Sequence, residues 1–117
     1  MDDDVYELLD GATGFDWDDG NAPKVASRHD VAPGECEQAF FVEPFAVTFD
    51  AMHALHEPRW RALGRTLAGR HLYLVFTFRG TGGKLIRVIQ ARAMNRKERQ
   101  AYEQIQTRVE KDPDVSD

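Results

Sequence analysis

At 117 residues, with 42% hydrophobic and 10% aromatic side chains, the chain is long and apolar enough to form one folded domain with a core. No apolar run reaches the roughly 20 residues that a membrane-spanning helix needs, and the single cysteine, Cys36, excludes an intramolecular disulfide, so we expect a cytoplasmic protein that contacts no membrane. The net charge of −5 conceals two unlike halves, because residues 1–57 hold 14 acidic and 2 basic side chains whereas residues 58–117 hold 6 acidic and 13 basic ones.

The two ends of the chain are acidic. Residues 1–14 finish in a glycine-containing stretch and predict a flexible acidic extension. Residues 112–117 predict a disordered tail. We therefore expect a single domain over residues 15–111.

The first half of this domain predicts a short strand and two helices. Residues 15–17 alternate apolar and polar side chains, as a strand does. Asn21, with Pro23 two residues later, predicts the start of a helix that ends near residues 29–30. A second helix is expected over residues 35–42, ended by Pro44.

The second half predicts four strands and a final helix. The strands are expected at residues 45–49, 59–67, 71–78 and 85–92, and the glycine-rich residues 80–83 join the last two as a hairpin. Asn95 and Glu98 predict a capping box at the start of the final helix. This order predicts an α+β fold, in which an antiparallel β-sheet carries two N-terminal helices and one C-terminal helix.

A four-residue turn that pairs Arg79 with Lys84 would set the hairpin register. One face would then be apolar, and the other would carry His71, Tyr73, Val75, Thr77, Arg79, Ile86, Val88, Gln90 and Arg92. In this register Arg87 falls on the apolar face, opposite Phe76. A bulge or a different turn would move it, because a one-residue slip exchanges the two faces of a strand. The polar face is a candidate floor for a phosphodiester site.

Basic side chains are concentrated between Arg59 and Arg99, where eleven lysines and arginines face one acid, Glu98. Nine of the eleven are arginine, whose planar guanidinium matches phosphate oxygens. The pattern favours phosphate recognition. The alternative is a face of salt bridges neutralised by the acidic half of the same chain.

Motifs in collinear order over residues 15–103 point to a family. They are residues 15–18, 20–21 with Lys24, 28–31, Glu35-x-Glu37 with 39–40, Glu57-x-Arg59, 63–66, 69–70, 75–79, 86–89, 91–92, 94–99 and 102–103. With these motifs the chain resembles the BrnT toxins, the ribonuclease half of BrnT–BrnA type II toxin–antitoxin modules. It departs from them at Asp30, where glycine is usual, at Gln90 and Ala93, where serine and aspartate are usual, and around residues 53–58.

The resemblance implies a RelE-like fold and metal-independent RNA cleavage that inhibits translation, without a cofactor. It also implies a partner, a BrnA-like antitoxin with a ribbon-helix-helix part, in a heterotetramer that contacts operator DNA only through the antitoxin. An alternative is a catalytically weak or inactive homologue that serves as an antitoxin-binding co-repressor module.

Metal-independent RNA cleavage uses the 2′-hydroxyl as nucleophile and needs a base, a proton donor and cations around the phosphorane. Arg79 and Arg92 are candidate clamps for that charge, and Glu57, His71 and Tyr73 are candidates for proton transfer. The side chains expected to hold the flanking backbone are Arg59, Arg65, Arg70, Lys84 and Arg87.

Several of these residues also have structural interpretations. Arg79 and Arg92 could pair with acids of the N-terminal half, His29 could cap a helix, and Tyr102 could be a core residue. His53, His56 and Glu57 lack further nearby ligands, so we expect no metal site. Direct DNA binding is disfavoured, because no helix has a recognisable basic recognition face.

Overall fold

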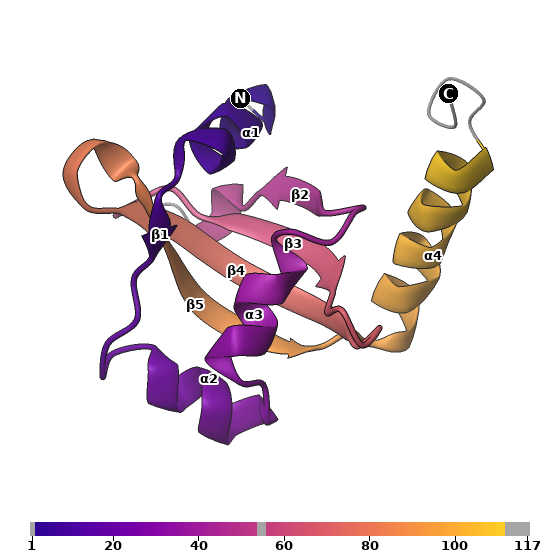
Figure 1. Ribbon diagram of the computed structural model, residues 1–117, viewed down its shortest axis with the longest axis horizontal. Coiled ribbons are helices and arrows are strands. Elements are labelled where there is room, and N and C mark those ends of the chain that lie inside the picture. The colour runs from indigo at the N-terminus through magenta and orange to yellow at the C-terminus, as the bar shows by residue number, and fades with distance from the viewer. Residues whose placement is uncertain (1, 54–55, 112–117) are drawn as a thin grey trace.

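The computed structural model describes residues 2–53 and 56–111, so the tail expected at residues 112–117 lies outside the described residues. The described chain forms an α+β fold with a five-stranded sheet and four α-helices (Figure 1). The strands are β1 (Gly14–Phe15), β2 (Ala46–Phe49), β3 (Trp60–Arg65), β4 (His71–Arg79) and β5 (Leu85–Ala93). Each lies at an expected strand position, with bounds shifted by at most two residues.

The sheet is mixed, which corrects the prediction of an antiparallel one. Its strand order is β1-β5-β4-β3-β2, and β1 runs parallel to β5, pairing Gly14 with Leu85 and Phe15 with Ile86. All other neighbours are antiparallel. Alternation within residues 15–17 predicts a strand but not its direction, because direction depends on which distant strand it meets.

The helices are α1 (Asp2–Gly11), α2 (Ala22–His29), α3 (Pro33–Ala39) and α4 (Arg96–Lys111). The start of α2 is as predicted, with a proline in its first turn. The capping box of α4 is confirmed, since the Asn95 side chain accepts the Glu98 N–H at 2.8 Å and the Glu98 carboxylate accepts the Asn95 N–H at 2.9 Å. None of the helices among the described residues is long and apolar enough to cross a membrane.

Helix α1 replaces the flexible extension predicted for residues 1–14. Val5 is fully buried in the core, and Leu9, one helical turn later, packs against it. The helix contacts β2. The acidic residues around Val5 and Leu9 obscure this short amphipathic pattern in the sequence.

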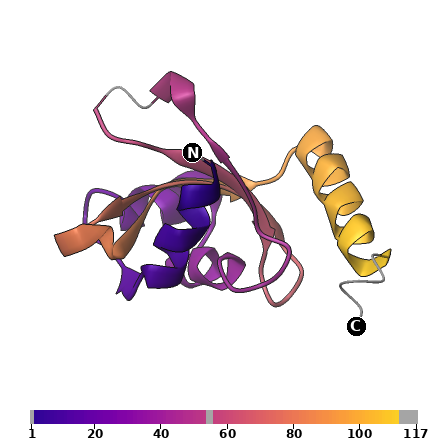
Figure 2. The same cartoon turned by 90° about the horizontal axis from the view of Figure 1, so that it is seen from above.

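The sheet separates α4 from the other helices, as Figure 2 shows with α1, α2 and α3 on one side and α4 on the other. The core lies on the side of α1–α3, where Leu72, Leu74 and Phe76 of β4 and Val88 of β5 are fully buried. The opposite face of the sheet carries polar side chains and is only partly covered by α4.

The hairpin register differs from the predicted one in its turn. Arg79 pairs with Leu85 rather than Lys84, so the turn has one more residue, and Gly80, Gly82 and Gly83 adopt positive φ within it. This shift puts Ile86 and Val88 in the core and Arg87 on the polar face beside Thr77, which reverses the prediction for these three.

A β-bulge then shifts the register a second time. Val75 pairs with Gln90 and Phe76 with Val88, so Ile89 is the extra residue of β5. Gln90 and Arg92 return to the polar face, and the prediction that they share it with Tyr73 is confirmed.

Asp30 ends α2 in the left-handed conformation, with φ 55° and ψ 45°. A β-carbon in this region costs about 1 kcal/mol, and an acidic side chain at a helix C-terminus also opposes the helix dipole. We expect Asp30→Gly to raise the free energy of unfolding by about 0.5–1 kcal/mol, measured by urea denaturation. Asp30→Ala removes the charge but keeps the β-carbon, so it should gain less than Asp30→Gly, through the helix dipole alone; an equal gain would refute the conformational explanation.

Candidate active site

The polar face of the sheet gathers five arginines, and we call it the arginine face. It consists of Arg61 and Arg65 on β3, His71, Tyr73, Thr77 and Arg79 on β4, and Arg87, Gln90 and Arg92 on β5. The register places Arg61 opposite Val75, Tyr73 opposite Arg92 and Thr77 opposite Arg87. Strand alternation is therefore the reason that these side chains share one surface.

The arginine face contains two separate clusters. Tyr73 and Arg79 lie six residues apart on β4, which corresponds to about 20 Å along a strand. His71, Tyr73 and Arg92 belong to the cluster beside α4, whereas Glu57 and Arg79 belong to the cluster beside the hairpin turn. The five predicted catalytic residues are thus not brought together around one point.

Arg92 is the centre of the cluster beside α4. Its guanidinium donates two hydrogen bonds to the Glu98 carboxylate, at 2.7 and 2.9 Å, and lies 3.9 Å above the centre of the Tyr73 ring. The hydrogen bonds from Arg92 lower the pKa of Glu98. Because Glu98 also caps α4, this contact fixes the start of the helix at the edge of the cluster.

Tyr73 adjoins a cavity of about 290 Å³ between α4 and the sheet, whose lining includes Arg61, Glu98 and Ile105. Burial raises the pKa of the Tyr73 phenol, although the charges of Arg61 and Arg92 oppose this effect. The phenol is therefore protonated at neutral pH and can donate a hydrogen bond. Arg61 is exposed and makes no ion pair within the described part of the chain.

His71 packs edge-on against Tyr102 of α4, with the ring centres 5.5 Å apart. Tyr102 is fully buried, and its hydroxyl donates to the carbonyl of Pro44 at 2.6 Å. Tyr102 therefore anchors α4 to the sheet, which supports its interpretation as a core residue.

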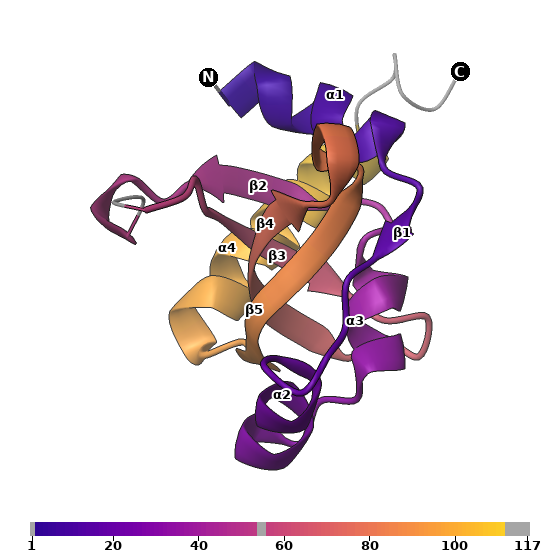
Figure 3. The same cartoon turned by 90° about the vertical axis from the view of Figure 1, so that its left-hand side faces the viewer.

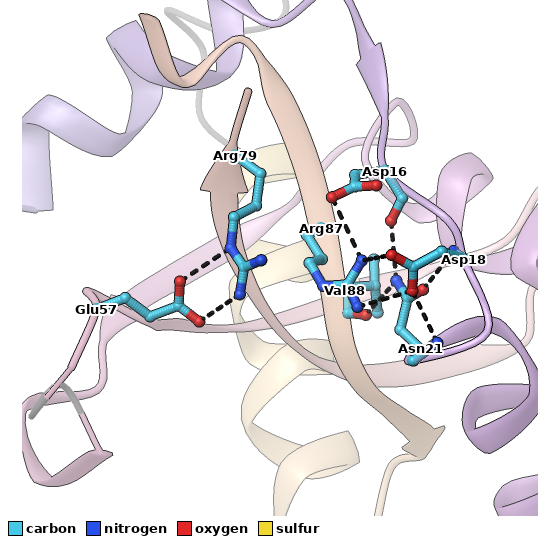
Figure 4. A network of polar contacts seen from close by, with 8 residues as sticks. Asp16, Asp18, Asn21, Glu57, Arg79, Arg87 and Val88 are labelled. Atoms are coloured by element: carbon cyan, nitrogen blue, oxygen red, sulfur yellow. Dashed lines mark hydrogen bonds and ion pairs between the residues drawn. The ribbon is translucent and has the colours of Figure 1, made fainter. Parts of the chain in front are cut away.

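The cluster beside the hairpin turn consists of arginines paired with carboxylates (Figure 4). Arg79 donates to both carboxylate oxygens of Glu57, at 2.9 and 3.0 Å, and these bonds lower the pKa of Glu57. Arg87 pairs with Asp18 at 3.0 Å and Asp16 at 3.3 Å, and its side chain is 12% exposed. The expected alternative, pairing with acids of the N-terminal half, is confirmed for Arg79, whereas Arg92 pairs with an acid of α4.

The remaining predicted RNA-binding residues lie at scattered positions. Arg65 donates to the carbonyl of Glu43 at 2.9 Å. Arg70 lies away from the arginine face, because it donates to the carbonyl of Asp30 at 2.8 Å and to Glu35 at 2.9 Å, between α2 and α3. Lys84 is exposed in the hairpin turn, and Arg59, just before β3, is partly buried.

Arg61 is the arginine of this face that is not among the site residues predicted from the sequence. The alternation of β3 could have found it, because Trp60 and Ala62 are core residues and Arg61 lies between them. Among the described residues, no three His, Cys, Asp or Glu side chains are grouped so as to hold a metal ion. Burial raises the pKa of the Cys36 thiol to about 12.

Comparison with known proteins agrees with the resemblance seen in the motifs. The family model of the ribonuclease toxin BrnT, of type II toxin–antitoxin systems, matches residues 17–98, which is more than half of the chain. The match includes every residue of the arginine face and leaves out α1 and most of α4. No relative was found among curated proteins. The chain therefore belongs to the BrnT family, the ribonuclease toxins of type II toxin–antitoxin systems.

Proposed function

We propose that the protein is a metal-independent endoribonuclease with a RelE-like fold, which inhibits translation in the cytoplasm. Membership of the BrnT family supports the activity in general terms. The observation that carries the site is the cluster beside α4, where the protonated phenol of Tyr73 lies between Arg92 and Arg61, next to a cavity of about 290 Å³. Arg61 makes no ion pair with the residues that the structure describes.

In the proposed reaction, the 2′-hydroxyl of one nucleotide attacks its own 3′-phosphate. The O2′–P bond forms and the P–O5′ bond breaks, which leaves a 2′,3′-cyclic phosphate and a 5′-hydroxyl end. The charge of the phosphorane is greatest in the transition state, so guanidinium groups aimed at it accelerate the reaction. Arg61 and Arg92 supply these groups, and Arg92 exchanges its Glu98 contact for the phosphate.

Proton transfer falls to the two side chains of β4 in this cluster. Tyr73 donates a proton to the leaving 5′-oxygen, since its phenol is protonated and adjoins the cavity. His71, two residues away on the same face, accepts the proton of the 2′-hydroxyl, a role that imidazole can fill near neutral pH.

The cluster beside the hairpin turn holds the flanking backbone in this proposal. Glu57 is a weak base because Arg79 lowers its pKa, so the pair is better suited to position RNA than to transfer protons. Lys84 and Arg59 extend this contact, and Arg87 orders the loop at residues 16–18. Arg65 and Arg70 hold the loops at Glu43 and Asp30, so we assign them no contact with the scissile phosphate.

The antitoxin belongs to the proposal as well. Type II toxins have a cognate protein antitoxin. We propose that this partner is a BrnA-like ribbon-helix-helix protein, that the two form a heterotetramer, and that operator DNA is contacted only through the antitoxin.

The proposal is tested by incubating purified, partner-free protein with a structured RNA in EDTA. We expect cleavage with 2′,3′-cyclic phosphate and 5′-hydroxyl ends, and no cleavage when the mapped site carries a single 2′-deoxynucleotide. Arg108→Ala, which removes an exposed arginine of α4, should cleave at the unchanged rate.

Ends with 5′-phosphate, or cleavage that stops in EDTA, would refute the 2′-hydroxyl mechanism. Intact RNA calls for a translation assay with the same protein. Translation arrest would then mean that cleavage requires the ribosome, whereas normal translation by folded protein would refute the ribonuclease and favour a co-repressor module.

A further inference from the structure

We propose that α2 and the adjoining edge of β5 form a second phosphate-binding site, which holds the RNA backbone beyond the arginine face. This inference rests on the proposed function. The site surrounds a cavity of about 520 Å³ whose polar lining is Lys24, Arg28 and His29 of α2 and Gln90 of β5.

The geometry of α2 explains why its cations converge on this cavity. Lys24 and Arg28 are four residues apart and therefore lie on one side of the helix. Val25, on that same side, is 2% exposed and packs into the core. The Asn21 side-chain amide donates to the carbonyl of Val88 at 3.0 Å, so the start of α2 is tied to β5 just before its bulge.

No described acidic side chain forms an ion pair with the cations of this site. Lys24 and Arg28 are the two basic residues of 1–57, a segment that also holds 14 acids. Nevertheless, neither forms an ion pair within the part of the chain that the structure describes, in contrast to Arg70, Arg79, Arg87 and Arg92. Unpaired cations around a cavity attract an anion.

The helix dipole does not explain why all three basic side chains lie on α2. Arg28 and His29 lie in the last turn of α2, where a cation is favourable. Lys24, however, lies in the first turn, where the dipole disfavours a positive charge. A bound phosphate explains all three, because it sits in the cavity that they line.

The site is continuous with the arginine face. Gln90 lines the cavity and also belongs to the arginine face, where Val75 separates it from Arg61 across the strands. Among the described residues β1 pairs with Leu85 and Ile86 alone, so the rest of β5 has no described strand beside it on that side. Figure 3 shows α2 beside the C-terminal end of β5, away from the hairpin turn. An RNA strand can therefore cross β5 from Arg61 and Arg92 to α2, and we expect the site to contact about two backbone phosphates, without sequence preference.

The test measures RNA affinity by fluorescence anisotropy. The probes are two single-stranded RNAs made uncleavable by 2′-O-methyl groups, a long one that spans both sites and a trinucleotide that covers only the arginine face. The variant is Lys24→Ala with Arg28→Ala, and the control is Arg99→Ala with Arg108→Ala, which removes the same charge from exposed positions of α4.

We expect the α2 variant to bind the long RNA about tenfold more weakly, with the slope of log K against log salt reduced by about 1.4, since each single-strand phosphate contact contributes about 0.7. Affinity for the trinucleotide should stay unchanged, because this probe covers only the arginine face. The α4 control should bind both RNAs like the wild type.

Unchanged affinity and salt slope for the long RNA would overturn the site, as would an equal loss for both RNAs. A lower melting temperature with unchanged binding would also overturn it and leave a structural role for α2. Weaker binding of the antitoxin but not of RNA would reassign the surface to the partner. If the wild type neither cleaves RNA nor arrests translation, and yet the variant loses affinity for the long probe, the site stands and the ribonuclease mechanism fails.

Discussion

Arg92→Ala should lower the rate of RNA cleavage by about 10²–10³-fold, the usual effect of removing one donor to a charged transition state. In the proposed reaction Arg92 and Arg61 both contact the phosphorane, so removing Arg92 takes away one of the two guanidinium groups that stabilise its charge. The measurement is single-turnover cleavage at saturating protein, which excludes changes in RNA affinity. Arg92→Lys keeps the charge without the fork, so it should recover only part of the rate.

A second variant separates catalysis from structure, since Arg92 also pairs with the capping residue of α4. Glu98→Gln removes the carboxylate but leaves the guanidinium and frees it for phosphate. It should therefore cleave RNA at least as fast as the wild type, provided that its circular dichroism shows an intact helix. If Glu98→Gln loses as much activity as Arg92→Ala, the pair is structural and the proposed role of Arg92 is wrong.

Phe76→Ala should cost about 3–5 kcal/mol of the free energy of unfolding and lower the melting temperature by roughly 10–20 °C. Phe76 is fully buried, and the rings of Phe40, Phe45, Trp60 and Phe78 surround it with centres 5.1–6.2 Å away. Removing it leaves a cavity between α3 and the sheet. Urea denaturation measures the loss.

The matched control is Phe41→Ala. Phe41 is 78% exposed, and its ring lies edge-on to that of Phe15 at 6.4 Å between ring centres. It should therefore change stability by no more than about 0.5 kcal/mol. Similar losses for the two variants would mean that the aromatic cluster does not dominate the core.

The local signals in the sequence predict most of the secondary structure. Proline near the start of α2, the Asn95–Glu98 pair before α4 and the alternation along β3–β5 each act within a few residues, and each corresponds to an element of the fold. The direction of β1 and the packing of α1 depend on distant parts of the chain. Sequence periodicity carries no such information.

The candidate site was predicted less completely than the fold. Alternation places Tyr73, Arg79 and Arg92 on one face, but the carboxylates that pair with Arg79 and Arg92 depend on where Glu57 and α4 come to lie. The separation of Arg79 from Arg92 could have been predicted, because one adjoins the hairpin turn and the other lies at the far end of β5. The alternation along β3 equally predicts that Arg61 lies on the arginine face.

The bulge at Ile89 decides which arginines can act on the same side of the molecule. Arg87 and Arg92 are separated by an odd number of positions, and in a regular strand such residues point in opposite directions. The extra residue changes the parity of the interval, so that both guanidinium groups emerge on one surface while Val88 and Ala91 remain inside. A regular strand that kept all the residues of β5 would turn one of the two arginines into the core. Deleting Ile89 instead leaves an even interval of four, so both arginines should stay on one surface without the bulge.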